Sequence, residues 1–292
     1  MATTIIAARS SGHAVPLGRE LTVLRALPLN GIDAIGPFVF LDHGGPMAPP
    51  ANGIGAHPHA GIEVITYLLQ GSNKHRDSFG HVGEVSSGGV QWITSGRGML
   101  HAEIPSGDGE PVMEAVQLWA RHPEALDRTA PRYQAVQSHE IVEVETPGYF
   151  ARLISGTLPG VFPSPGPVQL SQPSTLAHFT LVPGASVQIP LPPGQELGIF
   201  VMRGAGLVEE ANAAKADILL LAATDSIALS ARPDSAFEVL LLGGERARRP
   251  LVFAGSFVFN SQADVDRANS DLIEGYMGVL DGVPRGVTPR EA

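Results

Sequence analysis

Glycine and proline punctuate this chain at short intervals, and the segments between them are rich in β-branched and aromatic residues. The 292 residues include 34 glycines and 25 prolines. Both residues spoil helix interiors, whereas they commonly bound strands and turns. The strand-like runs are residues 38–41, 62–69 and 90–94 in the first half, and 177–182, 197–201, 218–222 and 237–242 in the second. This pattern predicts an all-β protein of many short strands, arranged as a sandwich or barrel.

The two blocks of strands resemble each other in style, which suggests an internal duplication with a join near residues 130–150. We expect an N-terminal domain over residues 1–135 and a C-terminal domain over 136–292. A short helix is expected around Pro123 to Arg128. The tail from Ser261 to Leu280 has apolar residues near helical spacing, with Ser261 as its cap, and predicts an amphipathic helix packed on the β-structure rather than a partner-binding helix.

Composition excludes several classes of function. The chain has no cysteine, so disulfides and thiolate sites are ruled out. Its net charge of −10 argues against direct nucleic-acid binding, which needs clustered lysine and arginine. The longest apolar stretch, Ile218 to Ala223, is too short for a membrane span, and Met1 to Leu27 lacks the apolar core of a secretory signal. We therefore expect a cytoplasmic protein.

Two short motifs carry the chemistry: His57-Pro58-His59 and His101-Ala102-Glu103. Side chains two residues apart in a strand point to the same face, so each motif offers two donors to one face of a sheet. Pro58 suits a strand edge and keeps His57 away from helical angles. If the two strands face a common interior, three imidazoles and one carboxylate meet at one point and form a site for a divalent metal.

Other histidines carry weaker signals. His75 and His81 lie in the polar stretch Asn73 to His81 and are expected to be exposed turn residues. His43 follows an apolar run and is placed, loosely, at the mouth of the site. Beyond the join the chain has only His178, so we expect the second domain to hold no metal. Trp92 and Met99 are expected to pack the interior rather than contact substrate.

At these motifs the sequence resembles the pirin family. The similar segments are Gly55 to Glu63, Tyr67 to Gly71, His75 to Ser78, Gln91 to Glu103, Gln117 to Trp119, Pro131 to Gln134, Leu242 to Glu245 and Gly255 to Asn260. The resemblance runs from about Phe38 to the tail, and the Gln91 to Glu103 segment is the most specific. Pirins are bicupins, so it implies two antiparallel β-barrels of cupin type, plus the C-terminal helix predicted above.

The resemblance also implies a metal site in the N-terminal barrel, usually holding iron, with His57, His59, His101 and Glu103 as its four protein ligands. Glu63 stands where a general cupin has its carboxylate ligand; pirins also carry a glutamate there without using it as one, so a supporting or structural role is expected. Ala60, Ile62 and Gly89 depart from the residues common in the family, which leaves the shape of the pocket open.

Imidazole and carboxylate donors suit Fe(II), Mn(II), Co(II) or Ni(II), while Cu and Zn remain possible. Four protein ligands on an octahedral ion leave two positions for water, dioxygen or a substrate oxygen. Glu103 is also placed to act as a general base toward a substrate hydroxyl.

Two functions follow from the resemblance. The first is a dioxygenase that cleaves a flavonol such as quercetin, or a related aromatic hydroxy compound, with O₂. The alternative is a metal- or redox-dependent regulator that binds another protein without turnover, and a purely structural metal is a third option. A monomer is the simplest expectation.

Overall fold

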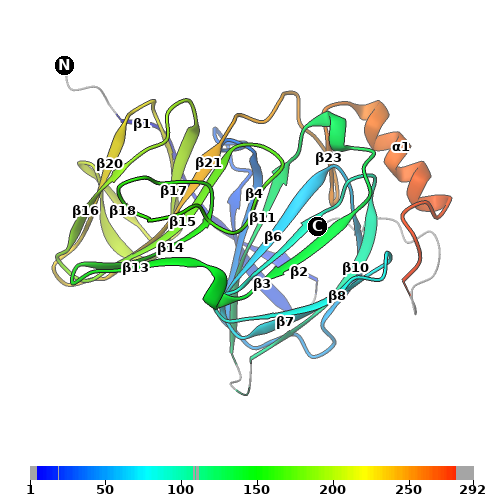
Figure 1. The fold of residues 1–292 in the computed structure, drawn as a ribbon, viewed down its shortest axis with the longest axis horizontal. Helices are drawn as coiled ribbons and strands as arrows, with labels where there is room; N and C mark the ends of the chain where they lie inside the picture. Colours follow the sequence, from blue (N-terminus) through cyan, green and yellow to red (C-terminus); the bar gives the residue numbers. More distant parts are fainter. Residues whose placement is uncertain (1–4, 19, 108, 110–111, 281–292) are drawn as a thin grey trace. The chain divides into compact units, whose positions relative to one another are not determined.

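The computed structural model describes residues 5–18, 20–107, 109 and 112–280, and these are mostly β-strand with one α-helix near the C-terminus (Figure 1). The strands form two cupin-type domains, as predicted, and each is a jelly-roll sandwich rather than a closed barrel. The sheets are open: edge strands such as β12 and β5 pair with a neighbour on one side only among the described residues. None of the helices in this part of the chain combines the length and apolar character needed to cross a membrane.

The chain divides into two compact units, each assembled from three separate stretches. The apolar unit comprises Met1–Ala14, Leu24–Asp42 and His139–Ala247. The histidine unit comprises Val15–Val23, His43–Ser138 and Arg248–Ala292. Each unit therefore draws on both halves of the sequence, and the domain boundary between residues 135 and 136 stays a prediction.

The apolar unit is built on a ten-stranded sheet with the main order β1-β19-β17-β21-β15-β14-β13. Its strands are β1 (Ile6–Ser11), β13 (Val142–Glu145), β14 (Tyr149–Ser155), β15 (Ser174–Leu181), β16 (Ser186–Pro190), β17 (Glu196–Val208), β18 (Ala211–Ala214), β19 (Asp217–Leu221), β20 (Ser226–Ala231) and β21 (Phe237–Gly244). All four strand-like runs predicted for the second half lie in these strands, apart from residues at two run ends.

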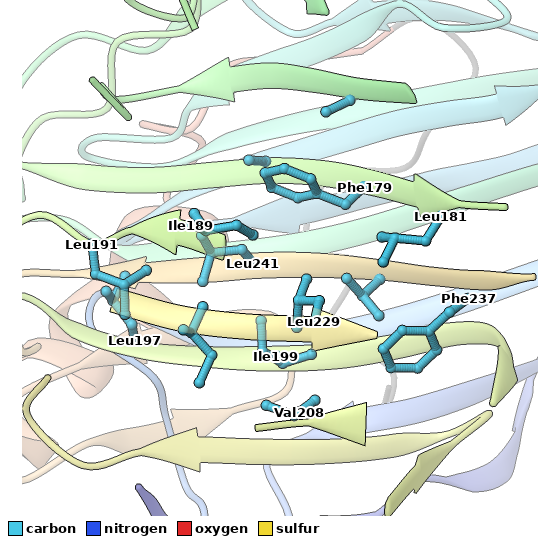
Figure 2. Close-up of a cluster of buried hydrophobic side chains, with 14 of the residues drawn as sticks. Phe179, Leu181, Ile189, Leu191, Leu197, Ile199, Val208, Leu229, Phe237 and Leu241 are labelled. Carbon is cyan, nitrogen blue, oxygen red and sulfur yellow. The ribbon is translucent and has the colours of Figure 1, made fainter. Parts of the chain in front are cut away.

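Side chains fill the interior of the apolar unit. Figure 2 shows Phe179, Ile199, Phe237 and Leu241 among the apolar residues that project from neighbouring strands into one cluster, and all four are fully buried. His178 precedes Phe179 in β15, so alternation directs it to the opposite face. There its Nε2 lies 3.1 Å from a carboxylate oxygen of Glu238.

The histidine unit contains a four-stranded sheet in the order β5-β10-β7-β8 and contributes to a seven-stranded sheet in the order β12-β9-β6-β11-β4-β3-β2. The strands are β2 (His13–Leu17), β3 (Leu21–Leu27), β4 (Phe38–Met47), β5 (Ile54–His59), β6 (Ile62–Gln70), β7 (Ser72–Asp77), β8 (Val82–Ser86), β9 (Val90–Thr94), β10 (Met99–Ser106), β11 (Met113–Arg121) and β12 (Arg132–Val136). The two sheets face each other, because Gln91 of β9 bonds Glu103 of β10 and Trp119 of β11 contacts His59 of β5.

The C-terminal helix α1 (Gln262–Ile273) belongs to the histidine unit and lies beside β23 (Phe257–Phe259), which pairs with β22 (Val252–Ala254) (Figure 1). Ser261 caps it as predicted, by accepting a hydrogen bond from the amide of Asp264. Val265, Ala268 and Leu272 are buried against the strands.

The helix ends earlier than the predicted Leu280. Gly275 has a φ of 84°, its amide bonds the carbonyl of Leu272, and the amide of Tyr276 bonds the carbonyl of Asp271. This pair of bonds is the Schellman motif that closes a helix at a left-handed glycine. Tyr276, which the periodicity placed on the buried face, is consequently exposed. The short helix predicted after Pro123 is a single 3-10 turn, η1 (Glu124–Leu126).

Candidate metal centre

Strands β5 and β10 run antiparallel and bring the two predicted motifs together. His101 lies directly opposite His57, and Met99 lies opposite His59. Directly opposed residues share a face, so three histidines project into the space between the sheets. Strand β5 is at the edge of its sheet, where the missing amide proton of Pro58 costs no ladder hydrogen bond on the open side.

The three imidazoles converge. One ring nitrogen from each of His57, His59 and His101 lies within 4.8 Å of the others, the one such group of His, Asp, Glu or Cys found in the described part of the chain. The Nε2 atoms of His57 and His101 are 2.9 Å apart. Two nitrogens bound at right angles to one ion, at bonds of about 2.1 Å, would be about 3.0 Å apart. The separation therefore fits two adjacent ligands of a single metal.

The outer nitrogens of the rings have partners that turn the inner nitrogens toward the centre. Nδ1 of His57 lies 2.9 Å from the carbonyl oxygen of Gly55, and Nδ1 of His59 lies 3.3 Å from that of Ser256. Such second contacts orient metal-binding histidines and set their tautomers. Nε2 of His59 is buried and has no hydrogen-bond partner among the described residues. A bound metal would supply the partner that this nitrogen lacks.

Burial keeps two of the rings neutral. Loss of solvent lowers the pKa of His59 and of His101 well below the usual 6.5, and the nearby ring of His57 lowers both further. A neutral imidazole has the lone pair that a metal requires. The donor set therefore fits a divalent metal ion at neutral pH.

Glu103 is placed differently from the three histidines. It is 3% exposed, but it is not part of the compact group of nitrogens. The pairing with β5 shifts between His101 and Glu103, so Glu103 lies opposite Ile54. Its Oε1 accepts hydrogen bonds of 2.7 Å from the side-chain amides of Asn73 and Gln91. Glu103 as fourth ligand stays a prediction, and these two amides are functional candidates that sequence reasoning missed.

The prediction for His75 was wrong. The residue is in β7 and is 2% exposed, because Asn73, His75 and Asp77 alternate inward while Lys74 and Arg76 point outward. Both faces of this strand are polar, so it has the composition of a loop. His75 Nδ1 lies 3.4 Å from Nδ1 of His101.

The remaining candidates lie around the triad without joining it. His81 is partly exposed in the turn after β7, with its Nδ1 2.8 Å from Asp77. His43 is buried in β4, 2.6 Å from a carboxylate oxygen of Glu114, and its place at the mouth of the site stays a prediction. Glu63 is buried in β6 and outside the compact group. Met99 is fully buried, as expected, whereas Trp92 is only partly buried.

Comparisons with known proteins agree with this geometry. The pirin family model matches residues 20–120, and the model of the pirin C-terminal cupin domain matches residues 176–278. A pirin-like protein of Arabidopsis thaliana is 32% identical over 246 residues, which cover 81% of this chain and 78% of the relative. A Pseudomonas aeruginosa protein, whose name assigns it provisionally as a quercetin 2,3-dioxygenase, is 33% identical over 82% of this chain and 86% of its own.

Solved structures extend the likeness to the fold. The crystal structure of quercetin 2,3-dioxygenase from Acinetobacter baumannii matches with a TM-score of 0.85 and 26% identity, over 94% of this chain and 98% of that one. A nickel(II) complex of a bacterial pirin from Escherichia coli shares the fold, with a TM-score of 0.62 at 22% identity. Both family models and the relatives cover most of the sequence. The chain therefore belongs to the pirin family.

Proposed function

We propose that the protein is an iron-dependent dioxygenase that cleaves a flavonol such as quercetin with O₂. The observation that carries this proposal is the convergence of three imidazoles, two of them almost fully buried, around one point. The likeness to the Acinetobacter baumannii quercetin 2,3-dioxygenase, which spans nearly the whole chain, supports the choice of reaction.

The proposed ligands are His57, His59 and His101, with Glu103 as the fourth. Imidazole and carboxylate donors suit Fe(II), and the same set accommodates Mn(II), Co(II) or Ni(II). A bound iron ion would polarise the substrate hydroxyl and bring it together with dioxygen, so that the heterocycle is cleaved and carbon monoxide is released.

Glu103 is assigned the role of general base toward the substrate hydroxyl. Its carboxylate is buried, and the amides of Asn73 and Gln91 hold one of its oxygens in a fixed direction. A base held in this way needs little reorganisation when it accepts a proton. The proton would therefore pass to Glu103 as the substrate binds.

The side chains beside the triad on the facing sheet are apolar or aromatic. Val64 lies opposite both Ile93 and Trp119 in the sheet, so the three side chains share the face that looks toward the triad. The Trp119 ring lies edge to face with His59, with 5.3 Å between centroids. The triad therefore borders an apolar, partly aromatic wall, which is in keeping with the aromatic substrate proposed.

The test is aerobic turnover of quercetin by protein loaded with Fe(II), followed by loss of the flavonol absorbance and by carbon monoxide release. The His59→Ala variant, carried through the same loading, is the control. The proposal predicts turnover well above this control. Equal rates in the two proteins, with iron bound to the parent, would reject the flavonol assignment and leave the metal centre standing.

A further inference from the structure

We infer that His75 and Asp77 are positioning residues that determine which nitrogen of His101 carries the proton, and thereby whether His101 can bind a metal. This inference rests on the proposed metal centre but not on dioxygenase activity. Neither residue belongs to the predicted ligand set, and neither is in the compact group of three histidines.

The residues form a continuous buried chain that starts at the metal centre. Asp77 lies directly opposite His101 between β7 and β10, so the two side chains share the inner face. Nδ1 of His101 is 3.4 Å from Nδ1 of His75, and Nε2 of His75 is 3.1 Å from Oδ2 of Asp77. All three residues are at most 5% exposed. Water therefore does not substitute for these contacts.

The direction of each hydrogen bond follows from the carboxylate. Burial would raise the pKa of Asp77, but hydrogen bonds from His75, Phe79 and His81 outweigh it and lower that pKa, so the group is ionised at neutral pH. An ionised carboxylate only accepts. The neutral form of His75 then carries its one ring proton on Nε2, which leaves a lone pair on its Nδ1.

The lone pair on Nδ1 of His75 determines which ring nitrogen of His101 carries the proton. Two bare Nδ1 atoms facing each other would be unpaired acceptors in a buried place, which is costly. A proton on Nδ1 of His101 removes the conflict by donating to Nδ1 of His75. The lone pair of His101 is then on Nε2, which faces Nε2 of His57 at 2.9 Å and points into the metal centre.

Packing prevents His75 from turning away. The ring of Tyr133 stacks on it with 4.1 Å between centroids and an angle of 4° between planes. Gly83 lies opposite His75 on β8, and a Cβ atom there would come within 2.4 Å of the Tyr133 ring. Glycine at position 83 thus leaves the space that the stacked ring occupies.

The first experiment needs no substitution. Long-range ¹H–¹⁵N NMR of the protein loaded with diamagnetic Zn(II), labelled at its histidines, distinguishes protonated ring nitrogens from those with a free or metal-bound lone pair. The inference predicts a protonated Nε2 in His75 and a protonated Nδ1 in His101. The opposite tautomer in either ring would overturn it.

The second experiment replaces Asp77, the last residue in the series of contacts from His101 through His75, with asparagine. Oδ1 of Asp77 accepts from the backbone amides of Phe79 and His81. The asparagine oxygen is expected to keep these bonds, so its NH₂ group would face His75 and force that proton onto Nδ1. His101 would then carry its proton on Nε2, where a metal must bind. We expect the affinity for Co(II), measured by titration calorimetry, to fall about 10- to 100-fold.

A matched control is His81→Gln, because His81 also contacts Oδ2 of Asp77 but lies outside the chain to His101. Its Co(II) affinity is expected to stay within about twofold of the parent. Should Asp77→Asn not fold, His75→Phe keeps the stack on Tyr133 but removes the acceptor, and it is expected to lose affinity by about tenfold or more. An affinity within twofold of the parent in the folded variant would refute the inference. Failure of the parent itself to bind Co(II) would instead refute the metal centre.

Discussion

Replacing His59 with leucine is expected to abolish metal binding at the triad and yet leave the metal-free protein at least as stable as the parent. The reason is that His59 is fully buried with Nε2 lacking a hydrogen-bond partner among the described residues. A ring in this state leaves one of its nitrogens unused by the fold, as the proposed role of a metal ligand requires. Leucine occupies a similar volume beside Trp119 and has no polar atom to satisfy.

The size of the effect follows from two opposing terms. Removing an unsatisfied buried polar group recovers about 1–3 kcal/mol. Losing the contact between Nδ1 and the Ser256 carbonyl, which at 3.3 Å is long, costs about 0.5–1.5 kcal/mol. At pH 7 the free energy of unfolding of the metal-free variant should therefore exceed that of the parent by about 1 kcal/mol, the difference between the midpoints of these two ranges.

The pH dependence sharpens the prediction. Burial holds the pKa of His59 in the folded protein well below 6.5, so only the unfolded chain takes up this proton as the pH falls below 6.5. The parent thus loses stability on acidification, by about 1.4 kcal/mol per pH unit for one such histidine. Leucine cannot take up a proton, so the advantage of the variant should grow by about 1 kcal/mol between pH 6.5 and 5.5, because the unfolded histidine is already half protonated at pH 6.5.

The assay is urea unfolding of both proteins with a chelator present, at pH 7.0, 6.5 and 5.5. His139→Gln serves as control, because this exposed ring changes its surroundings little on unfolding. A His59→Leu protein that is less stable than the parent at pH 7 by more than about 0.5 kcal/mol would refute the reasoning. So would a difference that does not change with pH.

Three further outcomes are expected. Glu103→Gln should weaken Fe(II) binding by at least about tenfold in an anaerobic titration, and an unchanged affinity would remove Glu103 from the ligand set. Burial lowers the pKa of His122 from 6.5 to about 4, so the parent should lose about 3 kcal/mol of stability between these pH values; urea unfolding of His122→Asn should show a correspondingly flatter profile. Ser261→Ala should cost about 1 kcal/mol and lower the melting temperature, because the amide of Asp264 loses its cap; no shift in Tm would show that the cap contributes nothing.

The triad could be predicted from sequence because the relevant periodicity is short. Strand alternation alone places His57 and His59 on one face, and the register of β5 with β10 brings His101 opposite His57. Pro58 was compatible with this prediction because β5 is an edge strand.

The supporting residues could not be predicted in the same way. His75 lies in a strand whose two faces are both polar, so no contrast between faces marks it as buried. Ser256 contacts His59 across 197 positions of sequence, and only the tertiary fold brings the two together. The end of the helix could have been predicted, because a glycine such as Gly275 commonly terminates a helix. The helical spacing of Tyr276 and Leu280 instead led to the prediction of a longer helix.

The most direct test of the metal centre is an anomalous diffraction map, recorded at the iron absorption edge from crystals loaded anaerobically with Fe(II). A single peak at bonding distance from Nε2 of His57, His59 and His101 is predicted, with Glu103 at its remaining protein position. A peak bound by other residues, or no peak at the triad in iron-loaded crystals, would contradict the account.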